Sequence, residues 1–243
     1  MIIGINGYAG SGKDTVGTII QYLKAKPENT SLEDVLDFPL THQWWLEDMS
    51  TWEIKKWAGK LKSIASMLTG INQEKFEDQE FKKTNLDSQW DCNPPGKVGT
   101  VYRQPMTVRD FLQKLGTDAI RDGLHTNAWV NALMADYTPT QVQWSDGPLG
   151  GYKDGPMPNW IITDTRFPNE AQAIKDKGGI VIRVDRPGVK PINDHPSEVG
   201  LDSWKFDYKI ANVSDLKALT GTVEMILLKE NILECVDSVQ TTN

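Results

Sequence analysis

The chain has 243 residues, 24% charged and 39% hydrophobic, with a formal net charge of -7, and this size fits one large domain or two small ones. No apolar run reaches about 18 residues and no basic stretch precedes the short apolar N-terminus, so we expect neither a membrane span nor a secretory signal. Two isolated cysteines argue against a disulfide framework and a cysteine-type zinc site, and they predict a cytoplasmic protein. The acidic balance argues against a broad surface for duplex nucleic acid, so any anionic ligand is expected in a local pocket.

The N-terminal part predicts a strand, a glycine-rich loop and a helix. The apolar residues 1–6 run directly into GYAGSGKDT, and apolar side chains then recur at helical spacing as far as Leu23. Residues 27–51 show no firm period and predict an irregular connection. A short strand in TWEIKKWA then leads into a second amphipathic helix over residues 60–68.

The middle of the chain predicts two helices between two irregular segments. Residues 71–105 are polar, with NPPGKVG at their centre, and predict a substrate-side insertion that covers a site. Thr107 is expected to cap a helix that ends at Gly116, and a second helix spans about residues 127–137. Residues 139–158 are rich in Gly and Pro and predict a surface loop.

The C-terminal part contains the clearest strand, NWIITDTR, followed by the helix PNEAQAIKDKGG and a second apolar run, GIVIRVDRPG. The polar residues 187–206 predict a lid, and YKIAN predicts a last strand. Ser214 is expected to cap a helix of about fifteen residues. The end from about Asp237 is expected to fray. Strands that alternate with helices imply one α/β domain over residues 1–243, with a parallel sheet covered on both faces and ligands at the carboxyl ends of its strands.

Residues 7–13, GYAGSGK, fit the phosphate-loop pattern, and they lie where its mechanism requires, after an apolar strand and before a helix. Backbone N–H groups and the helix N-terminus can surround phosphate oxygens, and Lys13 can follow the charge of a transferring phosphoryl group. We therefore predict a nucleoside triphosphate site rather than a glycine-rich turn that merely joins two elements. Asp14 replaces the usual Ser or Thr after the lysine and Thr15 follows, so we expect Mg²⁺ to be held mainly through water.

Other polar residues are candidate site residues, and each also has an ordinary structural role as an alternative. Asp164 ends an apolar strand and can hold a metal's water shell or bind substrate, or it can cap the next helix. Arg166 suits a phosphate or a surface ion pair. Arg109 and Gln113 lie four apart on one helical face, and Arg121 follows across a predicted break; these three side chains can converge on an anionic substrate with a base, or they can form a solvated face.

Arg183 and Arg186 frame the turn that opens the polar segment 187–206. Such arginines can clamp phosphates when a lid closes, or they can solvate the loop. His195 is not near a Ser or Cys that it could activate, so we expect a solvated or capping histidine.

The ordered motifs GKDT, AGKLK, VRDFLQKLGTDAIR, AWV, ITDTRFPNEA, VIRVDRPG, DHPSE and IAN resemble the phage-type deoxynucleoside monophosphate kinases, a branch of the adenylate-kinase-like P-loop proteins. The resemblance spans most of the chain, is weakest at residues 27–50 and 71–105, and leaves the tryptophan-rich residues 44–57 unmatched. It implies a P-loop NTPase fold, a three-layer α/β/α arrangement around a central parallel sheet, with lid and substrate-binding insertions. It also implies transfer of the ATP γ-phosphoryl group to a deoxynucleoside monophosphate with Mg²⁺, in the host cytoplasm if a phage encodes the chain.

The resemblance also assigns roles to residues. ATP binding falls on Gly7, Gly10, Ser11, Gly12, Lys13, Asp14, Thr15, Arg186 and Asn212, with Asn212 near the base. Acceptor binding falls on Lys62, Arg109, Gln113, Arg121, Asp164 and Arg166. Catalytic roles fall on Lys13, Arg166 and Arg186, and the metal is expected near Asp14, Thr15 and Asp164.

Three alternatives stay open on the sequence alone. Another small-molecule kinase, such as a dephospho-coenzyme-A kinase or a phosphomevalonate-type kinase, would share the phosphate loop and differ in its acceptor pocket. A nucleotide-dependent switch protein would bind ATP and transfer nothing. A homodimer is an alternative to a monomer, because apolar residues on unplaced helices can face a core or a partner.

Overall fold

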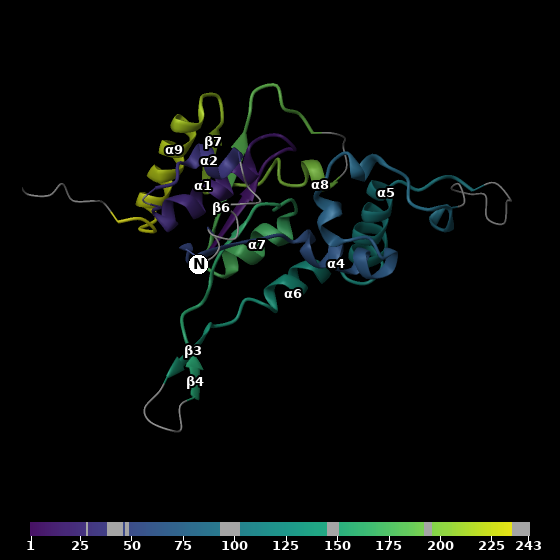
Figure 1. Cartoon of the computed structure of the whole chain (residues 1–243), viewed down its shortest axis with the longest axis horizontal. Helices are drawn as coiled ribbons and strands as arrows, with labels where there is room; N and C mark the ends of the chain where they lie inside the picture. Colours follow the sequence, from purple (N-terminus) through teal and green to yellow (C-terminus); the bar gives the residue numbers. More distant parts are fainter. Residues whose placement is uncertain are drawn as a thin grey trace, which may run out of the picture. The chain divides into compact units, whose positions relative to one another are not determined.

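The computed structural model describes residues 1–27, 29–37, 46, 49–92, 103–144, 151–191 and 196–234. The chain divides into two compact units, one formed by Met1–Lys56 and Tyr137–Asn243 and the other by Trp57–Asp136. Figure 1 labels many of their helices and strands. Within these described ranges, no helix combines the length and the apolar character that crossing a bilayer requires.

The first unit is built on a five-stranded parallel sheet with the order β2-β5-β1-β6-β7. Its strands are β1 (Ile2–Asn6), β2 (Trp52–Lys55), β5 (Asn159–Ile162), β6 (Ile180–Asp185) and β7 (Tyr208–Ala211). Strands buried on both faces read as continuous apolar runs, which is why β1, β5 and β6 could be found in the sequence. The prediction of an α/β fold with a parallel sheet is confirmed.

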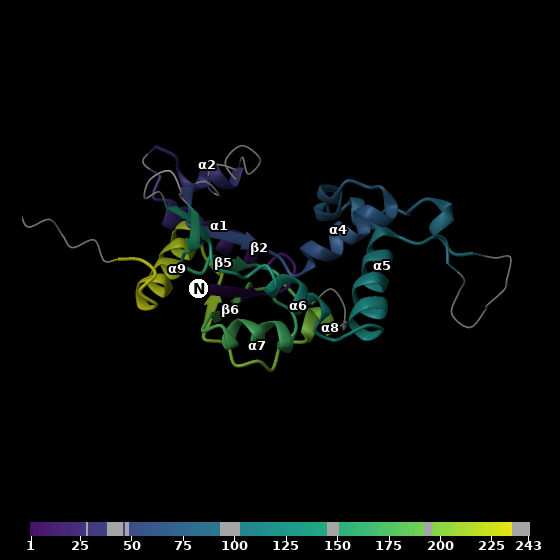
Figure 2. The ribbon, with the colours of Figure 1, turned by 90° about the horizontal axis from the view of Figure 1, so that it is seen from below.

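Helices cover both faces of this sheet. The unit contains α1 (Lys13–Ala25), α2 (Leu32–Asp37), α7 (Pro168–Asp176), α8 (Pro196–Val199) and α9 (Leu216–Lys229). Figure 2 shows α1 and α9 on one side of the sheet and α7 on the other. Right-handed crossovers explain this, because the chain moves from β1 toward β2 through α1 but in the opposite direction from β5 to β6 through α7.

The alternation of strand side chains divides the core between the two faces. Ile3 and Ile5 of β1 join the fully buried cluster that α1 and α9 complete. Gly4 faces α7, and a Cβ added there would lie 2.4 Å from Cδ1 of Ile174. This close approach explains a glycine in the middle of a buried strand.

The predicted surface loop at residues 139–158 is wrong in part. The chain forms a two-stranded antiparallel hairpin of β3 (Gln141–Trp144) and β4 (Gly151–Asp154), which is a sheet of its own (Figure 1). The Gln141 amide donates a hydrogen bond of 2.8 Å to the Asp154 carboxylate at the open end of the hairpin. The Gly and Pro content masked a four-residue run, QVQW, in which polar and apolar residues alternate as a strand requires.

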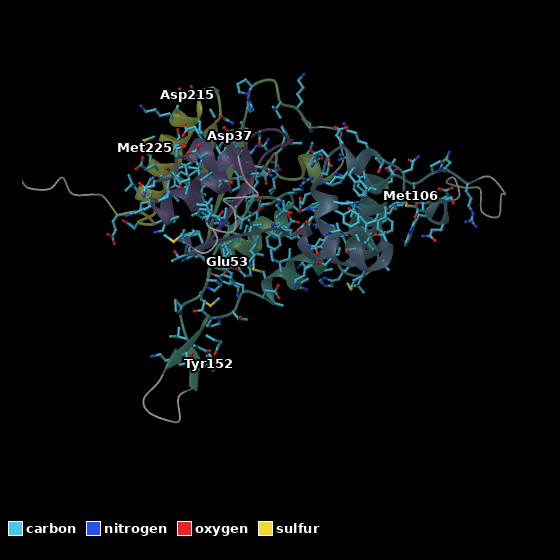
Figure 3. All side chains as sticks on the ribbon, viewed as in Figure 1. Asp37, Glu53, Met106, Tyr152, Asp215 and Met225 are labelled. Atoms are coloured by element: carbon cyan, nitrogen blue, oxygen red, sulfur yellow. The ribbon has the colours of Figure 1, made fainter. Side chains whose placement is uncertain are left out.

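The cap of α9 is Asp215 and not Ser214. The Asp215 carboxylate accepts a hydrogen bond of 2.9 Å from the backbone N–H of Ala218, and Figure 3 shows Asp215 at the start of the helix. The helix starts one residue later than the sequence suggested, so the serine lies outside capping range. The final residues, predicted to fray, lie outside the described part of the chain.

This cap gives a prediction with its own matched control. Replacing Asp215 by Ala should lower the free energy of unfolding by about 1 kcal/mol, because the first turn of α9 loses its acceptor. The neighbouring Ser214→Ala change should leave stability within about 0.5 kcal/mol of the wild type. Urea denaturation followed by circular dichroism would measure both, and equal losses in the two variants would contradict the assignment.

The second unit is helical. It contains α4 (Ala58–Thr69), the short 3₁₀ helices η1 (Gln73–Glu77), η2 (Phe81–Lys83) and η3 (Ser88–Trp90), then α5 (Val108–Gln113), the π-helix η4 (Lys114–Asp122) and α6 (Ala128–Met134). The predicted insertion over residues 71–105 thus consists, where described, of short turns. They pack around Phe76, which is fully buried in a cluster with Ala65, Val108 and Phe111.

Thr107 caps α5 as predicted, but the helix does not end at Gly116. The Thr107 hydroxyl accepts from the N–H of Asp110, and the Asp110 carboxylate accepts in return, which completes a capping box. Beyond Gln113 the helix widens and continues without a break to Asp122. Gly116 is there for packing: its carbonyl accepts 2.8 Å from the Trp129 indole, and an added Cβ would lie 2.9 Å from the Leu61 side chain.

Candidate functional site

The glycine-rich loop connects the end of β1 to the start of α1. Since β1 is the central strand, the loop lies at the carboxyl edge of the sheet between the ends of β5 and β6. The connection from β1 to β2 runs in one direction along the sheet and the connection from β5 to β6 runs in the other. Open α/β sheets bind ligands at such a switch point.

Three glycines give the loop its shape. Gly10 and Gly12 have φ angles of 83° and 96°, in the left-handed region that favours glycine. A Cβ at Gly7 would lie 2.3 Å from the Ser11 hydroxyl oxygen and 2.7 Å from the backbone oxygen of Val184. A side chain at any of these positions would therefore deform the loop.

One hydrogen bond within the loop and one from the residue after β7 hold the loop. The N–H of Ser11 donates 3.0 Å to the Tyr8 carbonyl, and the Asn212 amide, just after β7, donates 3.0 Å to the Ser11 carbonyl. The Ser11 hydroxyl is buried and finds no hydrogen-bond partner in the described part of the chain. A buried polar atom without a partner is costly, so this hydroxyl fits a phosphate oxygen as its missing partner. The expected place of Asn212 near the ATP base stays a prediction.

Lys13 and Asp14 bring opposite charges to the start of α1. The Lys13 ammonium lies 3.1 Å from one Asp14 carboxylate oxygen, and the Thr163 hydroxyl donates 2.9 Å to the other. Reduced solvation raises the pKa of the Asp14 carboxyl, but the charge and hydrogen bond of Lys13 and the hydrogen bond of Thr163 outweigh this, so the pKa lies below its ordinary value. Asp14 is therefore ionised at neutral pH beside the lysine.

A magnesium ion fits these residues only with water or phosphate as additional ligands. Among the described residues no group of three His, Cys, Asp or Glu side chains can hold a metal. Mg²⁺ commonly keeps several waters and takes one or two protein ligands together with substrate phosphates. The ionised Asp14 and the adjacent Thr15 match that donor set.

The end of β5 carries the next two candidates, Asp164 and Arg166. The Glu170 carboxylate, which is buried, accepts from the backbone N–H of Arg166 at 2.7 Å and of Phe167 at 3.0 Å. The Arg166 guanidinium donates 3.0 Å to Glu198 of α8, which is the ion pair considered as its alternative. Glu170 was not among the predicted site residues, although a glutamate three residues after the N-cap of a helix is a capping-box signal.

The second unit carries the remaining acceptor candidates. Lys62 is buried and forms an ion pair with Glu77. Arg109, on α5, donates a hydrogen bond of 3.3 Å to the Gln79 side chain, and Gln113 is the last residue of α5. Arg121 is buried on the π-helix, not beyond a break.

The two arginines that frame the turn after β6 differ in their surroundings. Arg186 is exposed, and its carbonyl accepts from the N–H of Val189 within the turn. Arg183 is buried in β6, so neither lid clamping nor solvation describes it. His195 lies outside the described residues.

A lysine-containing glycine-rich loop at the carboxyl end of the central strand of a parallel sheet is the arrangement found in P-loop proteins. The sequence model of the deoxynucleotide monophosphate kinase family matches residues 59–223, more than half of the chain, and the chain belongs to this family. Membership gives it deoxynucleotide monophosphate kinase activity, a phosphotransfer with a phosphate group as acceptor, and implies ATP as donor.

Viral relatives agree with this family. A protein of Acanthamoeba polyphaga mimivirus that carries the family's name is 31% identical over 197 residues, which cover 78% of this chain and 85% of the relative. The deoxynucleoside-5'-monophosphate kinase of Escherichia phage T5 is 24% identical over 88% of this chain and 90% of its own length. The deoxynucleotide monophosphate kinase of Enterobacteria phage T4 is 32% identical over 50% of this chain and 45% of its own length.

Proposed function

We propose that the first unit binds ATP at the phosphate loop and that its γ-phosphoryl group passes to a deoxynucleoside monophosphate, giving ADP and a deoxynucleoside diphosphate for DNA synthesis. The observation that carries the donor site is the loop at the end of β1, with its buried Ser11 hydroxyl and the adjacent Lys13. The family supports the acceptor class. In this proposal the fold is the three-layer arrangement of nucleoside monophosphate kinases.

Phosphoryl transfer needs no protein nucleophile, so the residues act by position and charge. Backbone N–H groups of the loop and the Ser11 hydroxyl bind the donor phosphates, and Lys13 offsets the charge that moves during transfer. Bound Mg²⁺, held through water by Asp14 and Thr15 with Asp164 nearby in the same unit, would neutralise phosphate charge.

The acceptor is assigned to the basic and amide side chains. Arginine forks bind phosphate oxygens with two hydrogen bonds, and an amide can read a base edge. In the second unit, the residues proposed to contribute to acceptor binding are Lys62, Arg109, Gln113 and Arg121. In the first unit, Arg166 is proposed to bind phosphate and Asp164 to accept a hydrogen bond from substrate. Arg186 and the segment 187–206 are proposed to close over the donor phosphates, which would exclude water as a competing acceptor.

A coupled assay of ADP release tests the proposal. It would contain ATP, Mg²⁺ and one candidate acceptor at a time, namely each deoxy- and ribonucleoside monophosphate, dephospho-coenzyme A and phosphomevalonate, with a control that lacks any acceptor. Release that depends on a deoxynucleoside monophosphate supports the proposal and identifies the accepted bases. Release without any acceptor, or only with dephospho-coenzyme A or phosphomevalonate, would contradict it. Light scattering of the same sample would distinguish a monomer from a homodimer.

A further inference from the structure

Arg183 is a buried cation directly beside the phosphate loop. Its side chain is only 8% exposed, and it donates 2.6 Å to the Asn6 amide oxygen, 2.7 Å to Asp185 and 3.4 Å to Asp202. A buried charge is tolerated only when several partners surround it. These contacts come from β1, from β6 and from the segment after α8, so the guanidinium joins three parts of the first unit.

The first half of the phosphate loop rests on this guanidinium. Tyr8 is the second residue of the loop, and its ring centroid lies 4.3 Å from the central carbon of the Arg183 guanidinium. Its hydroxyl donates to the Asp202 carboxylate, with both oxygens at 2.9 Å. Asn212 holds the second half of the loop at Ser11, so contacts of Tyr8 and Asn212 hold both halves.

The same guanidinium also reaches the end of β5 through one side chain. The Asn6 amide accepts from Arg183 and donates a buried hydrogen bond of 2.7 Å to the carbonyl of Thr165. Thr165 lies between Asp164 and Arg166, the two candidates on that strand end. If the Asn6 side chain rotated, the backbone at Thr165 would shift, and Asp164 and Arg166 would shift with it.

We propose that Arg183 is a positioning residue of the kinase, which sets the phosphate loop through Tyr8 and Asp202 and sets the Asp164–Arg166 strand end through Asn6. The inference rests on the proposed function, because it assumes that the loop binds ATP. Arg183 itself touches neither nucleotide in this proposal. Its effect is transmitted by side chains that are fixed before substrate arrives.

Two variants test the connections, Tyr8→Phe the one through Tyr8 and Asp202, and Arg183→Lys both together. Tyr8→Phe keeps the ring on the guanidinium and removes only the hydroxyl contacts to Asp202. Because a hydrogen bond to a charged group is lost at the loop, we expect a roughly 3- to 10-fold rise in the dissociation constant and KM for ATP, with the KM for the acceptor unchanged and only a small fall in Tm. Arg183→Lys keeps the charge and loses the fork, and we expect a rise of about 10-fold for ATP together with a lower kcat.

The controls are Tyr152→Phe on the exposed hairpin and Arg103→Lys, also exposed, which should behave as wild type. In the double variant, Tyr8→Phe should add less than it does alone, because both changes release the same loop. Dissociation constants come from calorimetry with ATP and no acceptor, and Tm from a thermal scan.

An unchanged ATP dissociation constant in both single variants, or a fall in Tm alone, would overturn the positioning role. If wild-type protein releases no ADP with any deoxynucleoside monophosphate, the proposed function fails. Weaker ATP binding by the Tyr8 and Arg183 variants would then still support the positioning role. Should Arg183→Lys not fold, Tyr8→Phe still tests the connection through Tyr8 and Asp202.

Discussion

Replacing Lys13 by Ala should lower kcat by on the order of 10²–10³-fold while the protein stays folded. The fold should survive the change because Lys13 is not among the buried residues of α1, whose apolar side chains Val16, Ile19 and Ile20 belong to the core. Two electrostatic effects combine. The moving phosphoryl charge loses its cation, and the Asp14 carboxylate, now without the ammonium 3.1 Å away, would repel the donor phosphates. The coupled ADP-release assay and a thermal scan measure the two properties.

The control for this change is Lys217→Ala, which removes an exposed lysine from the first turn of α9 and should leave kcat unchanged. Lys13→Arg keeps the charge with a different shape and should retain more activity than Lys13→Ala. Turnover within a few-fold of wild type in Lys13→Ala would mean that the loop does not serve the transferred group.

Replacing Trp160 by Ala should lower the free energy of unfolding by about 3–5 kcal/mol. The side chain is 2% exposed in β5, and Tyr137 meets its ring edge-on with centroids 4.8 Å apart. The Lys55 ammonium also lies 5.5 Å from the ring centroid. Truncation would therefore open a cavity between neighbours that belong to different parts of the chain and would remove both ring contacts.

Urea denaturation followed by far-ultraviolet circular dichroism measures this loss without relying on the removed fluorophore. Met225→Ala is the control, because this apolar side chain on α9, labelled in Figure 3, is 64% exposed and its removal should change stability by less than about 0.5 kcal/mol. Similar losses in both variants would show that burial of Trp160 is not what stabilises the sheet.

The elements that could be predicted are those whose signal is local. The runs IIGIN and IVIRVD are mainly apolar because both faces of their strands are covered, and the loop between β1 and α1 is recognised from glycines that the backbone conformation itself requires. The cap at Thr107 likewise depends on residues within one turn. For these, neighbours in the sequence are also the neighbours that decide the structure.

The π-helix could not be predicted because sequence patterns assume the α-helical period. Its buried residues, Gly116 and Arg121, lie five apart, which is the spacing of its i to i+5 hydrogen bonds. At a period of 3.6 residues they fall on different sides of a helix. Gly116 was therefore predicted to end the helix, and Arg121 was predicted to follow a break. The packing of Leu61 and Trp129 on Gly116 decides the outcome, and both come from other helices.

The setting of Arg183 was equally hidden, for a different reason. In the sequence it stands near a polar turn and beside Asp185, which suggests a solvated side chain. Its burial depends on Asn6, Tyr8 and Asp202, which are distant in the chain and meet only when β1 pairs with β6. A pattern within one segment cannot show such an arrangement.

The hairpin of β3 and β4 has a consequence for how this protein can be handled. Each of its strands has a single hydrogen-bonded neighbour, whereas β1 lies between two in the larger sheet. A two-stranded ribbon opens at a small fraction of the global unfolding free energy, so its amide hydrogens would exchange with solvent long before those of β1. The ribbon is thus the part of the first unit where an engineered peptide tag or a fluorescent label would disturb the fold least.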